Sequence, residues 1–315
     1  MLSRTLIRIK AFKELYSRVT TGSSDSSSAE KEVVQAFVKT RELYCLLSLL
    51  PYSLAVVASD KISAQNRKFN PDNEAIAFHK AMADNPFSAL VRSDSAFMNF
   101  CTNSGISWGV YENSLKSIYA AVLQKDYYRQ YAELQTPGMK DALNLFKNIY
   151  AQELSGNQVL EDELENSCIW WIEDLEYVIN QILDGLNKVA DSGKVSVPPV
   201  FANKEDENFA LKLTGTVLVN YDDLTETVSS HMQNWEVGRV VQSDILIVAM
   251  GLAEAQTFSS IPLKVTINEY VEIAKNYSTP KSYSFVNGLL NRILSKWCQE
   301  GKINKDMRGL AGGLI

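Results

Sequence analysis

The chain has 315 residues, and its hydrophobic content of 46% is enough for one large core or two smaller ones. Its 31 basic and 37 acidic residues give a net charge of -6, which excludes a uniformly basic polyanion-binding protein. The charges are unevenly placed. Residues 1–19 are basic, whereas the segment between Lys147 and Lys188 contains nine acidic residues and no basic one. These acidic residues are Glu153, Glu161, Asp162, Glu163, Glu165, Glu173, Asp174, Glu176 and Asp184.

The cysteines predict a reduced, cytoplasmic protein without a structural metal. Cys45, Cys101, Cys168 and Cys298 are far apart and form no CxxC pair. Charged residues interrupt the apolar residues of the N-terminus, so we expect no signal peptide. The uncharged run from Leu43 to Ser59 is shorter than a typical membrane span and contains Pro51. We interpret it as a buried, kinked core helix and expect no membrane association.

Helical periodicity extends along almost the whole chain and predicts an all-α fold. The expected helices lie near residues 3–19, from 30 to the turn "KFNPDN", and near 74–83, 87–103, 109–134 and 139–154. The polar connector "TTGSSDSSSAE" follows the first of them. The segment "EDELENSCIWWIEDLEYVINQILDGLNKVA" has the strongest helical pattern. Four more helices are expected near 205–230, 236–258, 266–277 and 281–299.

The segment "DSGKVSVPPV", from Asp191 to Val200, is the clearest domain boundary, because it is small, helix-breaking and carries two prolines. We therefore predict two helical subdomains. Residues 1–195 are expected to form an enlarged N-terminal subdomain, residues 201–300 a compact C-terminal subdomain, and residues 301–315 a flexible tail.

The sequence does not support an enzyme. His79 and His231 are the only histidines, and neither lies in a nucleophile motif. The chain has no GxxxxGK[ST] phosphate loop and no GxGxxG after a strand. We therefore expect neither a catalytic site nor a cofactor.

The segment from Ile261 to Ile293 contains two short helices with clear boundary signals. Pro262 ends the preceding element, and Thr266 and Glu269 have the spacing of a capping box. Lys275 then complements the dipole at the end of this helix. Thr279 and Pro280 predict the N-cap and first residue of the next helix. Its exposed first turn, with Lys281, Ser282 and Tyr283, would offer backbone amides and a lysine to a phosphate.

The same residues carry a family resemblance. The stretches "NWEVGRVVQSDILIVAMGLAEA" and "IPLKVTINEYVEIAKNYSTPKSYSFVNGLLNRI" resemble the C-terminal half of the NusB family of bacterial transcription antitermination factors. The matching residues are Phe209, Leu213, Trp235, Arg239, Asp244, Ile261, Pro262, Val265, Ile267, Asn268, Glu269, Glu272, Ala274, Lys275, Phe285, Val286, Asn287 and Gly288. The opening helix resembles the family's arginine-rich helix through Arg4, Arg8, Leu15 and Tyr16, although Thr5 and Leu6 stand where arginines usually continue. Family members are usually less than half as long, so residues from about 30 to 200 exceed the expected fold.

The resemblance implies an RNA-binding antitermination factor. Such a factor would act on the boxA element of ribosomal RNA leaders together with NusE, a ribosomal small-subunit protein, and RNA polymerase. Arg4 and Arg8, one helical turn apart, are expected to contact phosphates. Tyr16 and Phe285 would either stack on unpaired bases or belong to the core. The full set of expected RNA-binding residues is Arg4, Arg8, Lys10, Lys13, Tyr16, Lys275, Lys281, Ser282, Tyr283 and Phe285.

An alternative remains open on the sequence alone. The thinned arginine motif is compatible with a helical interaction scaffold that keeps a NusB-like fold but no longer binds RNA. In that case the acidic segment would contact a basic partner. Under either hypothesis we expect this segment to face solvent or a protein rather than RNA, because its charge repels phosphate.

Overall fold

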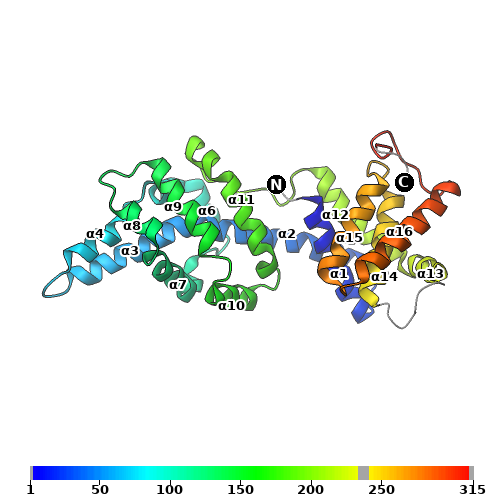
Figure 1. Cartoon of the computed structure of the whole chain (residues 1–315), viewed down its shortest axis with the longest axis horizontal. Coiled ribbons are helices and arrows are strands. Elements are labelled where there is room, and N and C mark those ends of the chain that lie inside the picture. Colours follow the sequence, from blue (N-terminus) through cyan, green and yellow to red (C-terminus); the bar gives the residue numbers. More distant parts are fainter. Residues whose placement is uncertain (1–2, 233–240, 312–315) are drawn as a thin grey trace. The chain divides into compact units, whose positions relative to one another are not determined.

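The computed structural model describes residues 3–232 and 241–311. All regular elements in these ranges are helices, and no β-strand occurs among them, which confirms the all-α prediction. The chain divides into two compact units (Figure 1). Unit 1 contains residues 1–36 and 201–315, and unit 2 contains residues 37–200.

Unit 1 is built around a helix that is buried on all sides. Its helices are α1 (Arg4–Thr21), the first part of α2 (Ser26–Ser48), α12 (Lys204–Val219), α13 (Tyr221–Ser230), α14 (Gln242–Thr257), α15 (Leu263–Tyr277) and α16 (Ser282–Gln299). The residues of α14 from Leu246 to Ala255 are all buried, as expected for a helix that is apolar around its whole circumference. It contacts α1, α12, α13, α15 and α16 (Figure 1).

The first helix belongs to the C-terminal unit and not to an N-terminal subdomain of residues 1–195. Ile7, Ala11 and Leu15 recur at helical spacing and are fully buried. Through this face α1 packs against α12 and α14. The boundary expected before residue 201 coincides with the end of unit 2 at Val200, but unit 1 also recruits residues 1–36 from the other end of the sequence.

Unit 2 contains the remaining helices and has its own hydrophobic core. They are the end of α2, then α3 (Leu50–Asn66), α4 (Asn73–Ala83), α5 (Pro86–Ser93), α6 (Ser95–Asn103), the 3-10 turn η1 (Trp108–Tyr111), α7 (Glu112–Leu123), α8 (Asp126–Ala132), α9 (Met139–Gln152), α10 (Gln158–Ser167) and α11 (Trp171–Ser192). Gly193 ends α11 with a φ of 67°, which glycine adopts more readily than any other residue.

The apolar run from Leu43 to Ser59 forms the predicted bent and largely buried helical segment, with α2 ending at Ser48 and α3 beginning at Leu50. Among the described helices, none is long and apolar enough by itself to cross a membrane. The pair α2 and α3 meets that criterion of length and composition only together, with a bend of 40° between them.

Two side chains from elsewhere in unit 2 complete the hydrogen bonding at this bend. Pro51 has no N–H, so the carbonyl of Leu47, four residues earlier, has no helical donor. The buried hydroxyl of Tyr150 donates to that carbonyl at 2.7 Å. The indole N–H of Trp108 donates to the carbonyl of Leu46 at 2.6 Å. The bend is therefore stabilised by specific donors, since a buried carbonyl without a partner is costly.

The segment after α16 was expected to be flexible, but its described part packs on unit 1. Ile303 and Lys305 are buried. The Lys305 ammonium donates to the carbonyl of Phe258 at 2.8 Å, and the Asp306 amide donates to the carbonyl of Ser259 at 3.2 Å. Burial lowers the pKa of Lys305. These bonds hold the segment against the α14–α15 connection.

We expect Tyr150→Phe to destabilise unit 2 by about 1–3 kcal/mol, because it leaves the buried Leu47 carbonyl without a donor while the ring is kept. Hydrogen exchange at increasing urea concentration measures the loss and reports unit 2 separately. Tyr16→Phe is the control, because that hydroxyl belongs to a side chain that is 40% exposed. Equal stabilities of the two variants would show that the hydroxyl contributes nothing at the bend.

Candidate nucleic-acid interface

Arg8 lies in the core of unit 1, with only 2% of its side chain exposed. Its Nε and Nη2 atoms donate to the two carboxylate oxygens of Glu254 at 2.7 and 2.9 Å, and its Nη1 lies 3.2 Å from the carboxylate of Glu269. The guanidinium also stacks over the ring of Phe209. Burial alone disfavours the charge, but the hydrogen bonds and charge of Glu254 outweigh it and raise the pKa of Arg8. The expected phosphate contact by Arg8 is therefore incompatible with this structure.

Glu254 is fully buried and has four donors. Besides the two from Arg8, it accepts from the hydroxyls of Thr266 at 2.9 Å and Tyr270 at 3.0 Å. Burial, followed by the charge of Glu254, raises the pKa of Tyr270 far above its ordinary value. The expected capping box is absent, because α15 begins at Leu263 and Thr266 lies inside it. The Glu269 carboxylate instead accepts from the Thr5 hydroxyl at 2.8 Å.

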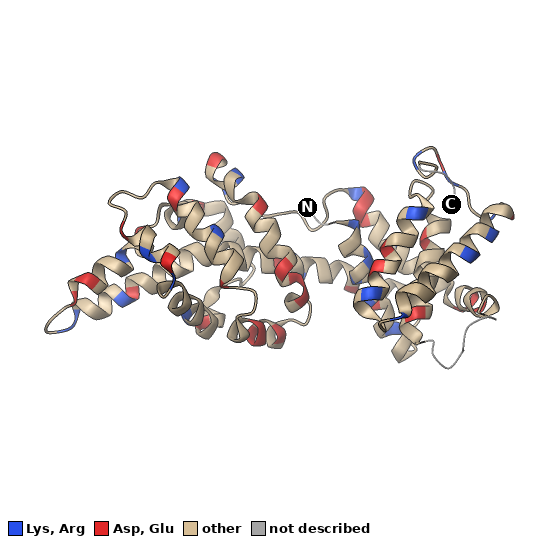
Figure 2. Cartoon of the chain, viewed as in Figure 1, with Lys and Arg blue, Asp and Glu red and all other residues tan. Residues whose placement is uncertain are grey.

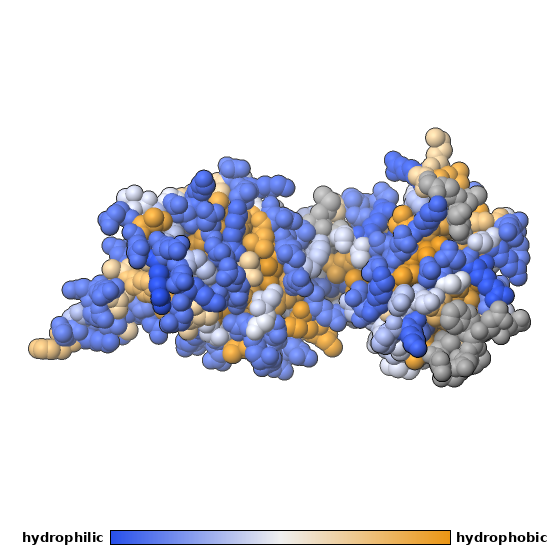
Figure 3. Space-filling model, viewed as in Figure 1, coloured by the Kyte–Doolittle hydropathy of each residue, from blue (hydrophilic) through white to orange (hydrophobic). Residues whose placement is uncertain are grey.

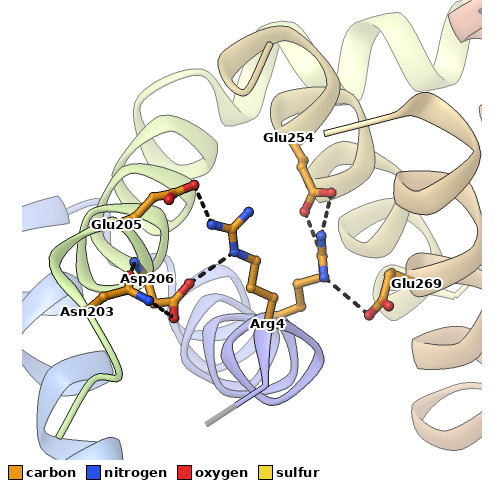
Figure 4. Close-up of polar contacts among 7 residues, drawn as sticks. Arg4, Asn203, Glu205, Asp206, Glu254 and Glu269 are labelled. Atoms are coloured by element: carbon orange, nitrogen blue, oxygen red, sulfur yellow. Dashed lines mark hydrogen bonds and ion pairs between the residues drawn. The ribbon is translucent and has the colours of Figure 1, made fainter. Parts of the chain in front are cut away.

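Arg4 is partly exposed but already paired (Figure 4). Its Nη2 lies 2.6 Å from the carboxylate of Glu205, and its Nε lies 3.0 Å from that of Asp206. Asn203 donates its side-chain amide to Asp206 and fixes this carboxylate. Partial burial opposes the charge of Arg4, but the hydrogen bonds to both acids raise its pKa. The hydrogen bond from Arg4 in turn lowers the pKa of Glu205. A phosphate could contact Arg4 only in competition with these two carboxylates.

The middle of α1, from Lys10 to Tyr16, contains buried, half-buried and exposed residues. Lys10 is buried, contrary to the expectation that it contacts RNA. Lys13 is half-buried, and its ammonium lies 5.0 Å from the ring centre of Tyr277, at the end of α15. Phe12 packs between Tyr16 and Tyr277, with ring centres 6.0 and 5.9 Å apart. The middle of α1 and the end of α15 are thus joined through aromatic rings.

The connection from α15 to α16 is held by one buried carboxylate. Asp244 accepts from the hydroxyls of Ser278 at 2.5 Å and Ser282 at 2.9 Å, which lie on the two sides of the turn. This arrangement explains the aspartate in the sequence motif. Helix α16 begins at Ser282 and not at Pro280, and Lys281 is its N-cap. The amides of Ser282 and Ser284 donate to the carbonyls of Thr279 and Lys281. Fewer backbone amides are therefore available to a phosphate at this helix start than the sequence predicted.

The remaining predicted residues separate into exposed and buried ones. Lys281 and Tyr283 are exposed, the latter by 45%. Lys275 is also exposed and pairs with Glu272 on the outer side of α15. Ser282 is buried and uses its hydroxyl for Asp244, and Phe285 is buried with 5% exposure. Of the two roles left open for Phe285, the structure supports the core.

We define the cationic–aromatic surface as Lys13, Tyr16 and Tyr277, which are linked by contacts with aromatic rings, together with Lys281 and Tyr283 at the start of α16, the helix that follows α15. Four of these were predicted from the sequence, and the structure adds Tyr277 through its contact with Lys13. The only sequence signal for Tyr277 is an aromatic residue at the end of a short helix. Trp235 and Arg239, which carry part of the sequence resemblance, lie outside the described residues.

The comparisons with known proteins place the family match in the sequence after residue 199. The model of the NusB family matches residues 200–295. The transcription antitermination protein NusB of Salinibacter ruber is 35% identical over 133 residues, which cover 42% of this chain and 82% of that relative. The chain belongs to the NusB family. NusB of Finegoldia magna is 36% identical over 94 residues, covering 30% of the chain and 69% of the relative. NusB of Chloroherpeton thalassium is 36% identical over 124 residues, covering 39% and 59%. No solved structure matches significantly.

All but one of the residues that the NusB family model matches belong to unit 1; the exception is Val200, the last residue of unit 2, and residues 37–199 lie outside the match. The chain is therefore a long variant of the family, as predicted. Its additional residues form a separately packed unit and are not an extension of the family core.

We expect Arg8→Ala to destabilise unit 1 of this NusB variant by about 3–5 kcal/mol, because it leaves Glu254 charged and buried without its ion-pair partner. The double variant Arg8→Met/Glu254→Gln should lose clearly less, because the one remaining carboxylate that contacted Arg8, Glu269, is partly exposed to solvent. Chemical unfolding of both variants measures the difference. Lys296→Ala is the control, since the pair that Lys296 forms with Glu300 is exposed. Equal losses for the single and double variants would argue against a coupled pair.

Proposed function

We propose that this chain is a non-catalytic, RNA-binding transcription antitermination factor that acts on boxA-type ribosomal RNA leaders together with NusE and RNA polymerase. The observation that carries the proposal is membership of a family whose relatives are named transcription antitermination proteins. The cationic–aromatic surface supports it, because it combines the residue types that bind single-stranded RNA.

Each part of that surface has a physical role in the proposal. Lys13 and Lys281 would neutralise phosphates and release their counterions. The exposed rings of Tyr16 and Tyr283 would stack on unpaired bases, for which every base offers a face. The Asp244 carboxylate holds the turn that carries Lys281, so this charge is positioned before RNA arrives. The negative net charge is no obstacle, since binding depends on a local surface.

A second function remains in competition because of the arginines. Arg8 forms a buried ion pair with Glu254, and Arg4 forms ion pairs with Glu205 and Asp206. This arrangement favours a protein-interaction scaffold that has kept the family fold and lost RNA binding. The proposal for RNA therefore depends on the lysines and tyrosines of the cationic–aromatic surface and not on the opening arginines.

A salt titration separates the two functions. We expect the full chain to bind a short single-stranded boxA-type leader RNA, with an affinity that falls linearly with salt on logarithmic axes and rises when the NusE homologue is added. In the same titration Lys281→Glu should weaken binding more than Lys302→Glu. Both variants change the net charge equally, but Lys302 lies after α16 beside Glu300. Equal effects of the two variants, or no binding of the leader above an unrelated RNA, would favour the scaffold.

The aromatic residues give an independent prediction. Tyr16→Leu should reduce RNA affinity by about 1–3 kcal/mol with little change in stability, because it removes an exposed stacking surface. Phe285→Leu should show the reverse pattern, with lower stability and nearly unchanged RNA affinity, because Phe285 is buried. Thermal unfolding and RNA binding are measured on both variants. RNA affinity that depends on Phe285 but not on Tyr16 would place the interface elsewhere.

A further inference from the structure

The corner between α10 and α11 in unit 2 exposes apolar side chains on a well-anchored backbone. Cys168 is extended, and the amide of Trp171 donates to its carbonyl at 2.9 Å, which closes a tight turn. The buried indole of Trp171 donates to the carbonyl of Lys39 at 2.9 Å, and its ring packs against Tyr111. These contacts hold the turn, so the residue at its tip, Ile169, is directed outward.

The exposed surface at this corner is apolar. Ile169, at the tip of this turn, is 75% exposed. Cys168, Trp170 and Ile172 beside it are partly exposed. Figure 3 shows apolar surface reaching solvent at the lower edge of unit 2, next to hydrophilic surface. Contiguous exposed apolar residues with a polar rim mark interaction sites more often than isolated ones do.

The rim of this corner is acidic. Glu165 precedes it, Glu173 and Glu176 follow it, and all three are exposed. Figure 2 shows acidic residues on α10 and the first part of α11. No basic residue occurs in the sequence between Lys147 and Lys188. Lys39, whose backbone carbonyl accepts from Trp171, pairs its ammonium with Glu42 at 2.7 Å.

We propose that this corner binds a short basic segment of a protein partner, with an apolar side chain of the partner against Ile169 and its lysines or arginines against the surrounding carboxylates. An apolar centre with a charged rim is the usual anatomy of a protein interface. The carboxylates steer a cationic partner and repel nucleic acid. The site lies in unit 2, outside the family match, so it does not depend on RNA binding by unit 1.

The test uses the full chain and a fluorescein-labelled 16-residue peptide of lysine, leucine and alanine, with the leucines on one helical face. Fluorescence anisotropy should show saturable binding that weakens with salt. Glu165→Gln/Glu173→Gln/Glu176→Gln should reduce the affinity at least tenfold, and Ile169→Ser at least threefold. The same peptide with serine in place of leucine should bind more weakly and be insensitive to Ile169→Ser.

A matched control removes three exposed acidic groups of unit 2 outside the corner, by Asp60→Asn/Asp126→Asn/Glu133→Gln. It should bind the peptide like the unaltered chain. Equal weakening by both triple variants would overturn the proposal, because binding would then follow net charge alone. The proposal also fails if sedimentation shows a dimer that Ile169→Ser dissociates, or if the corner crosslinks to leader RNA.

Discussion

The buried ion pair between Arg8 and Glu254 is the interaction on which the arrangement of unit 1 depends. It joins residues 246 positions apart in sequence, on α1 and on the central helix α14. Two desolvated charges are tolerated only when their hydrogen bonds are satisfied. Thr266, Tyr270 and Glu269 of α15 complete this requirement. The pair therefore ties α1 to α14 and fixes which face of α1, together with Ile7, Ala11 and Leu15, is turned toward the core.

The rotation of α1 decides what the molecule offers to a nucleic acid. With Arg8 turned inward, Lys13 and Tyr16 face the end of α15, where Phe12 and Tyr277 connect the two helices. Positive charge on this surface consequently comes from Lys13 in the middle of α1 and Lys281 at the start of α16. Asp244 has a supporting role there, because it fixes the turn that carries Lys281 without contributing to the exposed surface itself.

Unit 2 is inserted in the sequence of unit 1 between residues 36 and 201. Each unit buries its own apolar residues, so the insertion adds a second packed unit without replacing the family core. Their exposed chemistry differs: lysines and tyrosines in the cationic–aromatic surface, and isoleucine among carboxylates at the α10–α11 corner. This difference is consistent with separate partners for the two units.

The sequence by itself determined the features that are local. Helical periodicity predicted the all-α fold, Pro51 the bend between α2 and α3, and the motifs after Phe209 the family. Exposed Lys281 and Tyr283 followed from their place at a helix start. In each case the physical cause acts within a few residues, through the missing N–H of a proline or the repeat of apolar side chains on one helix face.

Only the tertiary structure decided which element each helix face packs against. Periodicity shows that α1 has an apolar side, but the partner that covers it lies more than 200 residues away, so its place in unit 1 was not predictable. For the same reason the sequence predicted Arg8 to be a phosphate ligand, whereas in the structure it forms a buried ion pair with Glu254. The local signal at Thr279 and Pro280 predicted the wrong first residue: a turn closed by the Ser282 amide and the Thr279 carbonyl comes first, and α16 begins at Ser282, whose hydroxyl donates to Asp244. Charges and hydroxyls are visible in a sequence, but their partners are chosen only by the packed fold.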